Sequence, residues 1–387
     1  MADETRLIRA GASDKPLVKT VGPPIQKGST VLLPSAQALY DDANFITYGR
    51  QGLAAQSALQ AALAEMEGAV GVSLYPSGLA ALSGALLAVL KAGDEVMVVD
   101  TIYKPTRRFC DHVLTRFGVG VSYYDPRTSP ETLVGEASAA TRLILAESPG
   151  SLTFEIQDLT RVAELATARG ILTAADNTWG AGYLYKPLDH GVDLSIQALT
   201  KYVGGHSDVF MGSAAARDPA LVRALDEGVL HLGWAVSGED AYQMLRGLRT
   251  LPVRLARQGQ SALTIAGWLQ AQPQVAAMYC PALPGSPDHA LWARDFTGAC
   301  GLFAFALKPA PDAAVEAFLD TLSLFGLGFS WGGFESLAIS GDPQLKSRVF
   351  QPDYGGPLIR LHIGLEHPDD LIADLKHGLA AYARLAT

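Results

Sequence analysis

The sequence of 387 residues is poor in cysteine, in positive charge and in long apolar runs. Its three cysteines lie far apart, so we expect neither a disulfide framework nor a zinc site and infer a reducing compartment. The formal net charge of −9 argues against a general nucleic-acid-binding protein, which needs a basic surface. No apolar run is long enough for a membrane span, and residues 1–15 lack the apolar core of a signal peptide. We therefore predict a cytoplasmic protein that binds no metal, nucleic acid or membrane.

The chain is longer than the size at which one core usually stops growing, which predicts more than one folded unit. Residues 1–50 are rich in Pro, Gly and Ser and predict an extended arm. Residues 51–248 alternate helical and apolar stretches, which predicts an α/β domain with a mostly parallel sheet covered on both faces. Residues 249–387 predict a smaller C-terminal α+β domain. The expected helices cover 53–67, 79–90, 106–117, 159–169, 253–270 and a stretch from 369, and the expected strands cover 95–99, 118–123, 143–146, 171–175, 298–307 and 358–363.

Two acidic residues directly follow expected strands of the larger domain, Glu147 after 143–146 and Asp176 after 171–175. In an open parallel sheet, ligands bind beyond the carboxyl ends of the strands. Asp176 precedes the small polar pair Asn177-Thr178 and is well placed to pair with a heterocyclic cation. The alternative is an acid that only caps a turn.

Lys201 follows the apolar stretch 195–200 and precedes the turn at Gly204-Gly205. A lone lysine is normally a solvated surface group. Here desolvation would lower its pKa and favour the neutral, nucleophilic amine that Schiff-base chemistry requires.

Tyr75-Pro76-Ser77-Gly78-Leu79 precedes an expected helix, and N–H groups at a helix start bind anions. Ser77 could equally be an ordinary helix N-cap. The order of the three features, an anion loop, a strand-end Asp and a lysine, favours a cofactor with a phosphate, a ring nitrogen and an aldehyde. Pyridoxal phosphate (PLP) has these three groups.

The sequence resembles the Cys/Met-metabolism family of fold-type I (aspartate aminotransferase-like) PLP enzymes, and most closely its bacterial cystathionine β-lyases. The resemblance covers nearly the whole chain. Its motifs are 47–50 (TYGR), 75–78 (YPSG), 102–106 (IYKPT), 147–151 (ESPGS), 176–179 (DNTW), 200–202 (TKY) and 360–364 (RLHIG).

The resemblance implies roles for individual residues. Lys201 would form the Schiff base and take up the substrate's Cα proton, and Tyr103 would stack on the cofactor ring. The other cofactor contacts would be Asp176 to the pyridine nitrogen, and Ser77, Gly78, Leu79 and Thr200 to the phosphate, with Tyr48 and Arg50 from a neighbouring subunit. The substrate contacts would be Arg360 to the α-carboxylate, together with Ser330, Trp331, Tyr242 and Tyr48.

Each role has a plainer alternative. Tyr103 could be an interface residue, Tyr48 and Arg50 a surface pair, Arg360 half of a structural salt bridge, and Trp331 part of the core. Two positions depart from the family: Ala198 stands where many members have Ser, and Gly22 where Asn is frequent. The first departure implies one phosphate hydrogen bond fewer.

The resemblance implies β-elimination: cystathionine would yield homocysteine, pyruvate and ammonia, in methionine biosynthesis by transsulfuration chemistry. Cystine and other cysteine conjugates are further candidate substrates. The motif at 147–151 and the segment 330–337 favour the β-lyase branch over the γ-lyases and γ-synthases. The family also implies a homotetramer built from two dimers with shared sites.

Two readings lie outside this activity. The segment 328–332 matches the G-x-S-x-G pattern of serine hydrolases, with Ser330 as the nucleophile and His362 further on. A PLP-binding regulatory protein without lyase turnover is the other alternative.

Overall fold

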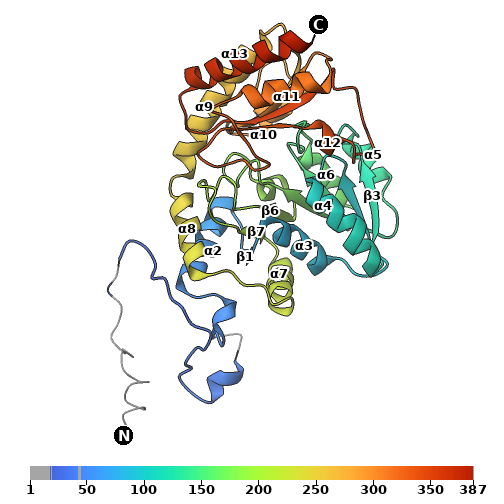
Figure 1. Ribbon diagram of the computed structural model, residues 1–387. Coiled ribbons are helices and arrows are strands. Elements are labelled where there is room, and N and C mark those ends of the chain that lie inside the picture. The colour runs from blue at the N-terminus through green and yellow to red at the C-terminus, as the bar shows by residue number, and fades with distance from the viewer. Residues whose placement is uncertain (1–17, 19, 42–44, 387) are drawn as a thin grey trace.

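The computed structural model describes residues 18, 20–41 and 45–386, and these form two sheets with helices packed around them (Figure 1). The first sheet has seven strands in the order β1-β7-β6-β5-β4-β2-β3. Its strands are β1 (Gly71–Tyr75), β2 (Glu95–Val99), β3 (Gly120–Tyr124), β4 (Thr141–Glu147), β5 (Leu172–Asp176), β6 (Leu194–Gln197) and β7 (Gly212–Ala216). Five neighbouring strands of this sheet, β6, β5, β4, β2 and β3, are parallel to one another. Strand β7 runs antiparallel to both of its neighbours.

Helices cover both faces of this sheet, as near-continuous apolar strands require. Leu59 and Leu63 belong to one buried apolar cluster, and Leu82 and Leu86 to another. The helices are α2 (Ala54–Glu67), α3 (Gly78–Val89), α4 (Lys104–Phe109), α5 (Pro130–Gly135), α6 (Leu159–Thr167), α7 (Pro219–His231) and α8 (Gly238–Leu248). Helices α2 and α3 therefore belong to different helical layers.

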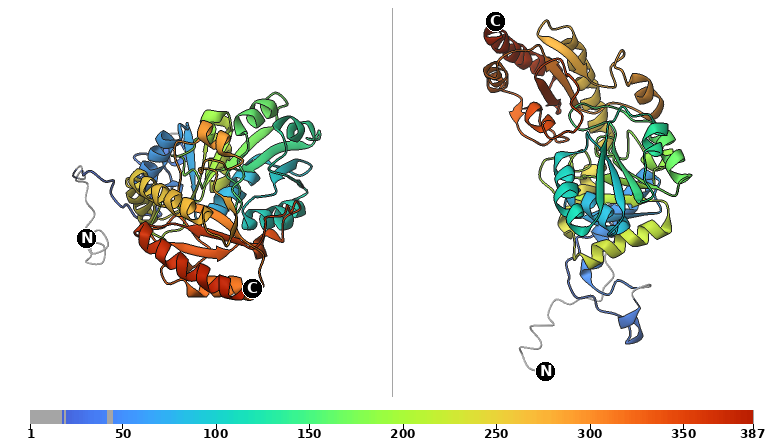
Figure 2. Two further views of the ribbon diagram at one scale, coloured as in Figure 1. Left: turned by 90° about the horizontal axis from the view of Figure 1, so that it is seen from above. Right: turned by 90° about the vertical axis from the view of Figure 1, so that its right-hand side faces the viewer.

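The second sheet lies between the first sheet and the C-terminal helix, as the views in Figures 1 and 2 agree. Its strand order is β10-β11-β12-β9-β8. Its strands are β8 (Val275–Tyr279), β9 (Leu302–Leu307), β10 (Gly326–Leu327), β11 (Leu337–Ser340) and β12 (Leu358–His362). The helices of this part are α9 (Leu251–Gln270), α10 (His289–Asp295), α11 (Asp312–Thr321), α12 (Asp342–Leu345) and α13 (Pro368–Leu385). None of the described helices is long and apolar enough to cross a membrane.

The expected α/β fold with a smaller C-terminal part is confirmed, and most elements begin or end within three residues of their predicted bounds. The predicted helix 106–117 does not form as one continuous α-helix. The chain forms α4, then a π-helical turn η3 (Cys110–Leu114) and a 3-10 turn η4 (Thr115–Phe117). Strands β1, β6 and β7 of the first sheet and β8, β10 and β11 of the second were not predicted. Because β7 is built from Gly, Ser and Ala alone, it carries none of the β-branched or aromatic residues that favour strands.

The described part of the N-terminal arm extends away from the rest of the chain (Figures 1 and 2). It holds two 3-10 turns, η1 (Gln37–Tyr40) and η2 (Gly49–Gln51), and a single bridge between Thr30 and Tyr48. Large apolar side chains of the arm face solvent, among them Val21, Leu32 and Tyr40, each more than 90% exposed. An arm of this kind leaves apolar surface uncovered within one chain.

Candidate active site

Two acidic side chains end neighbouring strands of the first sheet. Glu147 is the last residue of β4 and Asp176 the last of β5, and they are paired in register. Both line a cavity of about 770 Å³ that lies between the two sheets. The cavity therefore lies at the edge of the sheet where the sequence predicts that a ligand binds.

Lys201 lies in the same cavity, four residues after the end of β6. Its Nζ donates a hydrogen bond of 2.9 Å to Ser330 Oγ and lies 5.4 Å from the centre of the Trp331 ring. Burial, with a smaller contribution from the nearby charge of Arg360, lowers the pKa of Lys201 to about 8. A substantial fraction of this amine is therefore uncharged and nucleophilic near neutral pH.

Asp176 is buried and held by Thr178. Its Oδ1 accepts hydrogen bonds from Thr178 Oγ1 (2.5 Å) and from Thr178 N (3.1 Å). The same hydroxyl accepts a hydrogen bond of 2.9 Å from Ala198 N, three residues before Lys201. Burial raises the pKa of Asp176, while Thr178 and the charge of Lys201 oppose this. Thr178 thus joins the acid to the lysine segment, a role that the sequence analysis did not assign to it.

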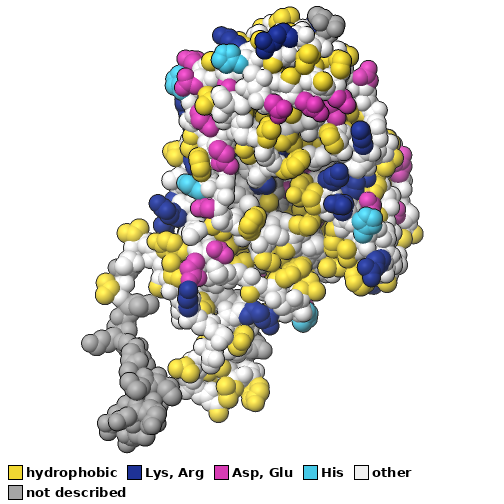
Figure 3. Space-filling model, in the orientation of Figure 1, with side chains coloured by type: hydrophobic (Ala, Val, Ile, Leu, Met, Phe, Trp, Pro, Cys, Tyr) yellow, Lys and Arg dark blue, Asp and Glu magenta, His cyan; other side chains and the backbone are white. Residues whose placement is uncertain are grey.

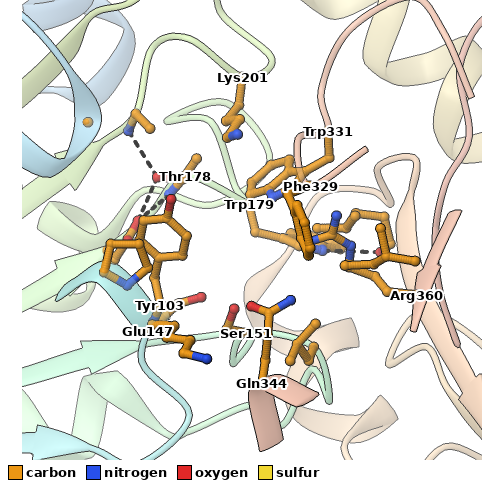
Figure 4. Close-up of a pocket in the computed structure, with 18 of the residues that line it drawn as sticks. Tyr103, Glu147, Ser151, Thr178, Trp179, Lys201, Phe329, Trp331, Gln344 and Arg360 are labelled. Carbon is orange, nitrogen blue, oxygen red and sulfur yellow. Dashed lines mark hydrogen bonds between the residues drawn. The ribbon is translucent and has the colours of Figure 1, made fainter. Parts of the chain in front are cut away.

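Glu147 supports the start of α4. Its Oε2 accepts a hydrogen bond of 2.6 Å from the N–H of Tyr103, the residue that precedes the helix. Burial, together with the charge of Asp176, raises the pKa of Glu147 well above its usual range. The Tyr103 side chain faces the cavity on the same side as Glu147 and Thr178, with Arg360 on the other side (Figure 4).

The start of α3 forms a cradle at the cavity wall. Ser77 caps the helix by accepting from Ala80 N (3.1 Å), and the N–H groups of Gly78 and Leu79 have no partner inside the helix. A Cβ atom at Gly78 would come within 2.3 Å of the Ala198 Cβ, so glycine permits the close approach of this loop to the lysine segment. The Thr200 hydroxyl, also at the cavity, exchanges hydrogen bonds with the Met211 backbone.

Arg360 lies on β12 and is buried at the opposite wall of the cavity. Its Nη2 donates to the carbonyl of Ser330 (3.0 Å), and its Nε has no hydrogen-bond partner. Burial lowers its pKa to about 10, so the guanidinium stays charged at neutral pH. No carboxylate of the described residues forms an ion pair with Arg360, so the alternative of a structural salt bridge finds no partner there. A buried, charged group of this kind suits an anionic ligand.

Ser330 bonds to Lys201 and Arg360 but does not line the cavity, and three further predicted site residues lie away from it. Tyr48 is half exposed on the arm, and Arg50 Nη1 donates to the carbonyl of Leu230 (2.9 Å). Tyr242, on α8, is partly buried, and a Cβ atom at Gly22 would come within 3.1 Å of its hydroxyl. Their expected contacts are therefore not formed within a single chain.

The local structure around Ser330 does not favour the serine hydrolase alternative. Residues 328–336 form neither helix nor strand, whereas a nucleophile elbow leads into a helix. His362 accepts a hydrogen bond from Gly332 N, and burial lowers its pKa to about 3. Its ring contacts the loop backbone and does not bond to the Ser330 hydroxyl, which accepts from Lys201.

A desolvated lysine, a strand-end carboxylate and an anion cradle around one cavity of an α/β sheet are typical of enzymes that use pyridoxal phosphate. The chain belongs to the Cys/Met metabolism PLP-dependent enzyme family, whose sequence profile matches residues 4–380. It is therefore a PLP-dependent enzyme of fold type I.

Relatives of this chain in the family differ in activity. The chain is 41% identical to the cystathionine β-lyase MetC of Escherichia coli, over 98% of this chain and 99% of the relative. It is 37% identical to an L-alanine/L-glutamate racemase of Wolbachia pipientis, over 100% of this chain and 99% of the relative. The crystal structure of a cystathionine γ-lyase from Lactobacillus plantarum, complexed with L-serine, superposes with a TM-score of 0.88 at 29% identity, covering 99% of this chain and 100% of the other.

Proposed function

We propose that this enzyme is a carbon–sulfur β-lyase that cleaves L-cystathionine with water to homocysteine, pyruvate and ammonia. The observation that carries the proposal is the double use of Ser330. Its hydroxyl accepts from Lys201 Nζ and its carbonyl accepts from Arg360 Nη2. The proton acceptor and the α-carboxylate site are thereby fixed to one residue, so a bound amino acid would present its Cα proton to Lys201.

The residues around the cavity fit the cofactor. Lys201 would hold its aldehyde carbon covalently, Asp176 its ring nitrogen, and the Tyr103 ring would cover its face. The phosphate would bind at the start of α3, where the N–H groups of Gly78 and Leu79 have no partner inside the helix. Ser77, Gly78, Leu79 and Thr200 would donate to it, and Ala198 in place of Ser removes one further donor.

When bound, pyridoxal phosphate acidifies the Cα–H of an amino acid by delocalising negative charge into its ring. Arg360 orients the substrate by its α-carboxylate. Lys201 would receive the Cα proton at Nζ, and its lowered pKa suits that task. The centre of the Trp331 ring lies 5.4 Å from Nζ, so this side chain would limit the access of water to the amine.

The pKa of Lys201 predicts how the cofactor-free protein takes up PLP. Only the neutral amine attacks the aldehyde, so the rate of uptake should rise with pH and level off above the pKa of about 8. Uptake is measured by stopped-flow absorbance between about pH 6 and pH 9.5. A rate that does not change over this range would contradict the assigned amine.

The bond that is broken is tested by product analysis with pure L-cystathionine. We expect homocysteine and pyruvate in equal amounts. Cysteine and 2-oxobutyrate would instead establish the γ-lyase alternative, which the shared fold with a γ-lyase keeps open. The racemase relative adds a third outcome, because racemisation shares the removal of the Cα proton. D-alanine from L-alanine, without keto acid from cystathionine, would identify that activity and overturn the proposal.

We further propose that the arm (1–50) contacts a second subunit, with 51–248 and 249–387 as the cofactor-binding and C-terminal domains, in a cytoplasmic homotetramer of two dimers with shared sites. The exposed apolar side chains of the arm support this proposal, since they would be covered by a second chain. Tyr48, Arg50 and Tyr242 would then complete the cavity of the other subunit, which explains why they lie outside their own.

Shared sites predict complementation between two inactive chains. Coexpression of Lys201→Ala with the double variant Tyr48→Ala/Arg50→Ala should restore about a quarter of the sites, because half of the random dimers are mixed and each has one intact site. The activity per chain is compared with that of each variant alone. Activity no greater than the sum of the two would contradict a shared site.

A further inference from the structure

Two cationic side chains of α4, Lys104 and Arg108, line the cavity but have no part in the chemistry above. They are four residues apart and so lie on the same side of the helix. Neither has a hydrogen bond or an ion pair with any residue that the structure describes. Arg107, between them in sequence, differs from both: it is buried and paired with Asp100.

Among the side chains that line the cavity, no acidic group compensates this pair. Four cationic side chains line it, Lys104, Arg108, Lys201 and Arg360, against two acids, Glu147 and Asp176. Both acids are already engaged: Asp176 with Thr178, and Glu147 with the N–H of Tyr103. On a chain with a net charge of −9, the mouth of this cavity is locally basic, and Lys and Arg side chains gather over α4 in Figure 3.

A leaving group that extends away from the α-carboxylate site would approach this pair. Lys104 directly follows Tyr103, and the α-carboxylate site at Arg360 is on a different wall (Figure 4). Ser151 and Gln344 face Lys201 across the cavity, and both are polar but uncharged. A group released from Cβ therefore meets cations and neutral hydrogen-bonding side chains, and no free carboxylate among the described lining residues.

We propose that Lys104 and Arg108 bind an anionic group at the far end of the leaving thiol, and that the enzyme prefers cysteine S-conjugates whose thiol half carries a carboxylate. The inference rests on the proposed β-lyase activity. The homocysteine half of cystathionine carries one carboxylate and one ammonium. Lys104 and Arg108 attract this carboxylate and repel this ammonium. A conjugate without the distal ammonium should therefore be a better substrate than cystathionine.

Three conjugates of matched length test the preference in the holoenzyme. S-(3-carboxypropyl)-L-cysteine keeps only the distal carboxylate of cystathionine, S-(3-aminopropyl)-L-cysteine keeps only the amine, and S-propyl-L-cysteine has neither. Each releases pyruvate, so one assay gives kcat/KM for all. We expect the carboxypropyl compound to exceed the aminopropyl compound by at least about tenfold, as for a hydrogen bond to a charged group.

The double variant Lys104→Gln/Arg108→Gln should bring this ratio close to one, whatever its absolute rate. Arg116→Gln, which removes an exposed arginine outside the cavity, should leave the ratio unchanged. A ratio near one in the unaltered enzyme, or a ratio that persists in the double variant, would overturn the inference and leave the β-lyase activity intact. Failure of all three compounds and of cystathionine to yield pyruvate would overturn the proposed function, and the inference with it.

Discussion

Replacing Lys201 with alanine should lower kcat/KM by at least about a thousandfold and abolish the visible absorbance of the bound cofactor. The side chain supplies both the covalent anchor and the proton acceptor. It is the cavity lysine whose pKa burial lowers to about 8. The variant also relieves the burial of an amine, so reduced stability is not the expected cause of inactivity.

Lys91→Ala is a matched control, since Lys91 is an exposed lysine outside the cavity. It should retain both the activity and the absorbance. Retention of the absorbance by the Lys201→Ala variant would show that another amine carries the cofactor.

Replacing Arg360 with glutamine should lower kcat/KM by about two to three orders of magnitude, chiefly through KM. The guanidinium stays charged at neutral pH, and its Nε has no partner among the described residues, so a substrate α-carboxylate would find an unpaired donor. Arg360→Lys keeps the charge but loses the planar, two-pronged guanidinium. Its activity should therefore lie between that of the unaltered enzyme and that of Arg360→Gln.

The visible absorption spectrum distinguishes the two variants. Arg360→Gln should still bind the cofactor and keep its visible absorbance, whereas Lys201→Ala should lose that absorbance. Steady-state kinetics with cystathionine and the absorption spectrum are measured on the same preparation. A variant with normal KM would assign the carboxylate to a different residue.

The strand-end acids were predictable from the sequence because parallel strands bring their carboxyl ends to one edge. Glu147 and Asp176 are 29 residues apart along the chain (176 minus 147), yet they are paired in register. The apolar stretch before Lys201 likewise predicted a desolvated amine, and the lowered pKa agrees with that expectation.

Other parts of the site depend on packing that no local pattern encodes. Nothing in the sequence around Lys104 and Arg108 separates them from Arg107, yet only Arg107 is buried and paired. Thr178 bridges Asp176 to Ala198, a contact between segments 20 residues apart. Tyr242 was expected at the substrate but lies near Gly22 of the arm, a contact between segments far apart in the sequence.

The central claim is that Lys201 carries the cofactor of this enzyme. Borohydride reduction of the purified holoenzyme, followed by peptide mass mapping, tests it directly because reduction makes the link between amine and cofactor permanent. We expect one modified peptide per chain, with the phosphopyridoxyl group on Lys201. A label on another lysine, or no label on a protein that still forms pyruvate from cystathionine, would contradict it.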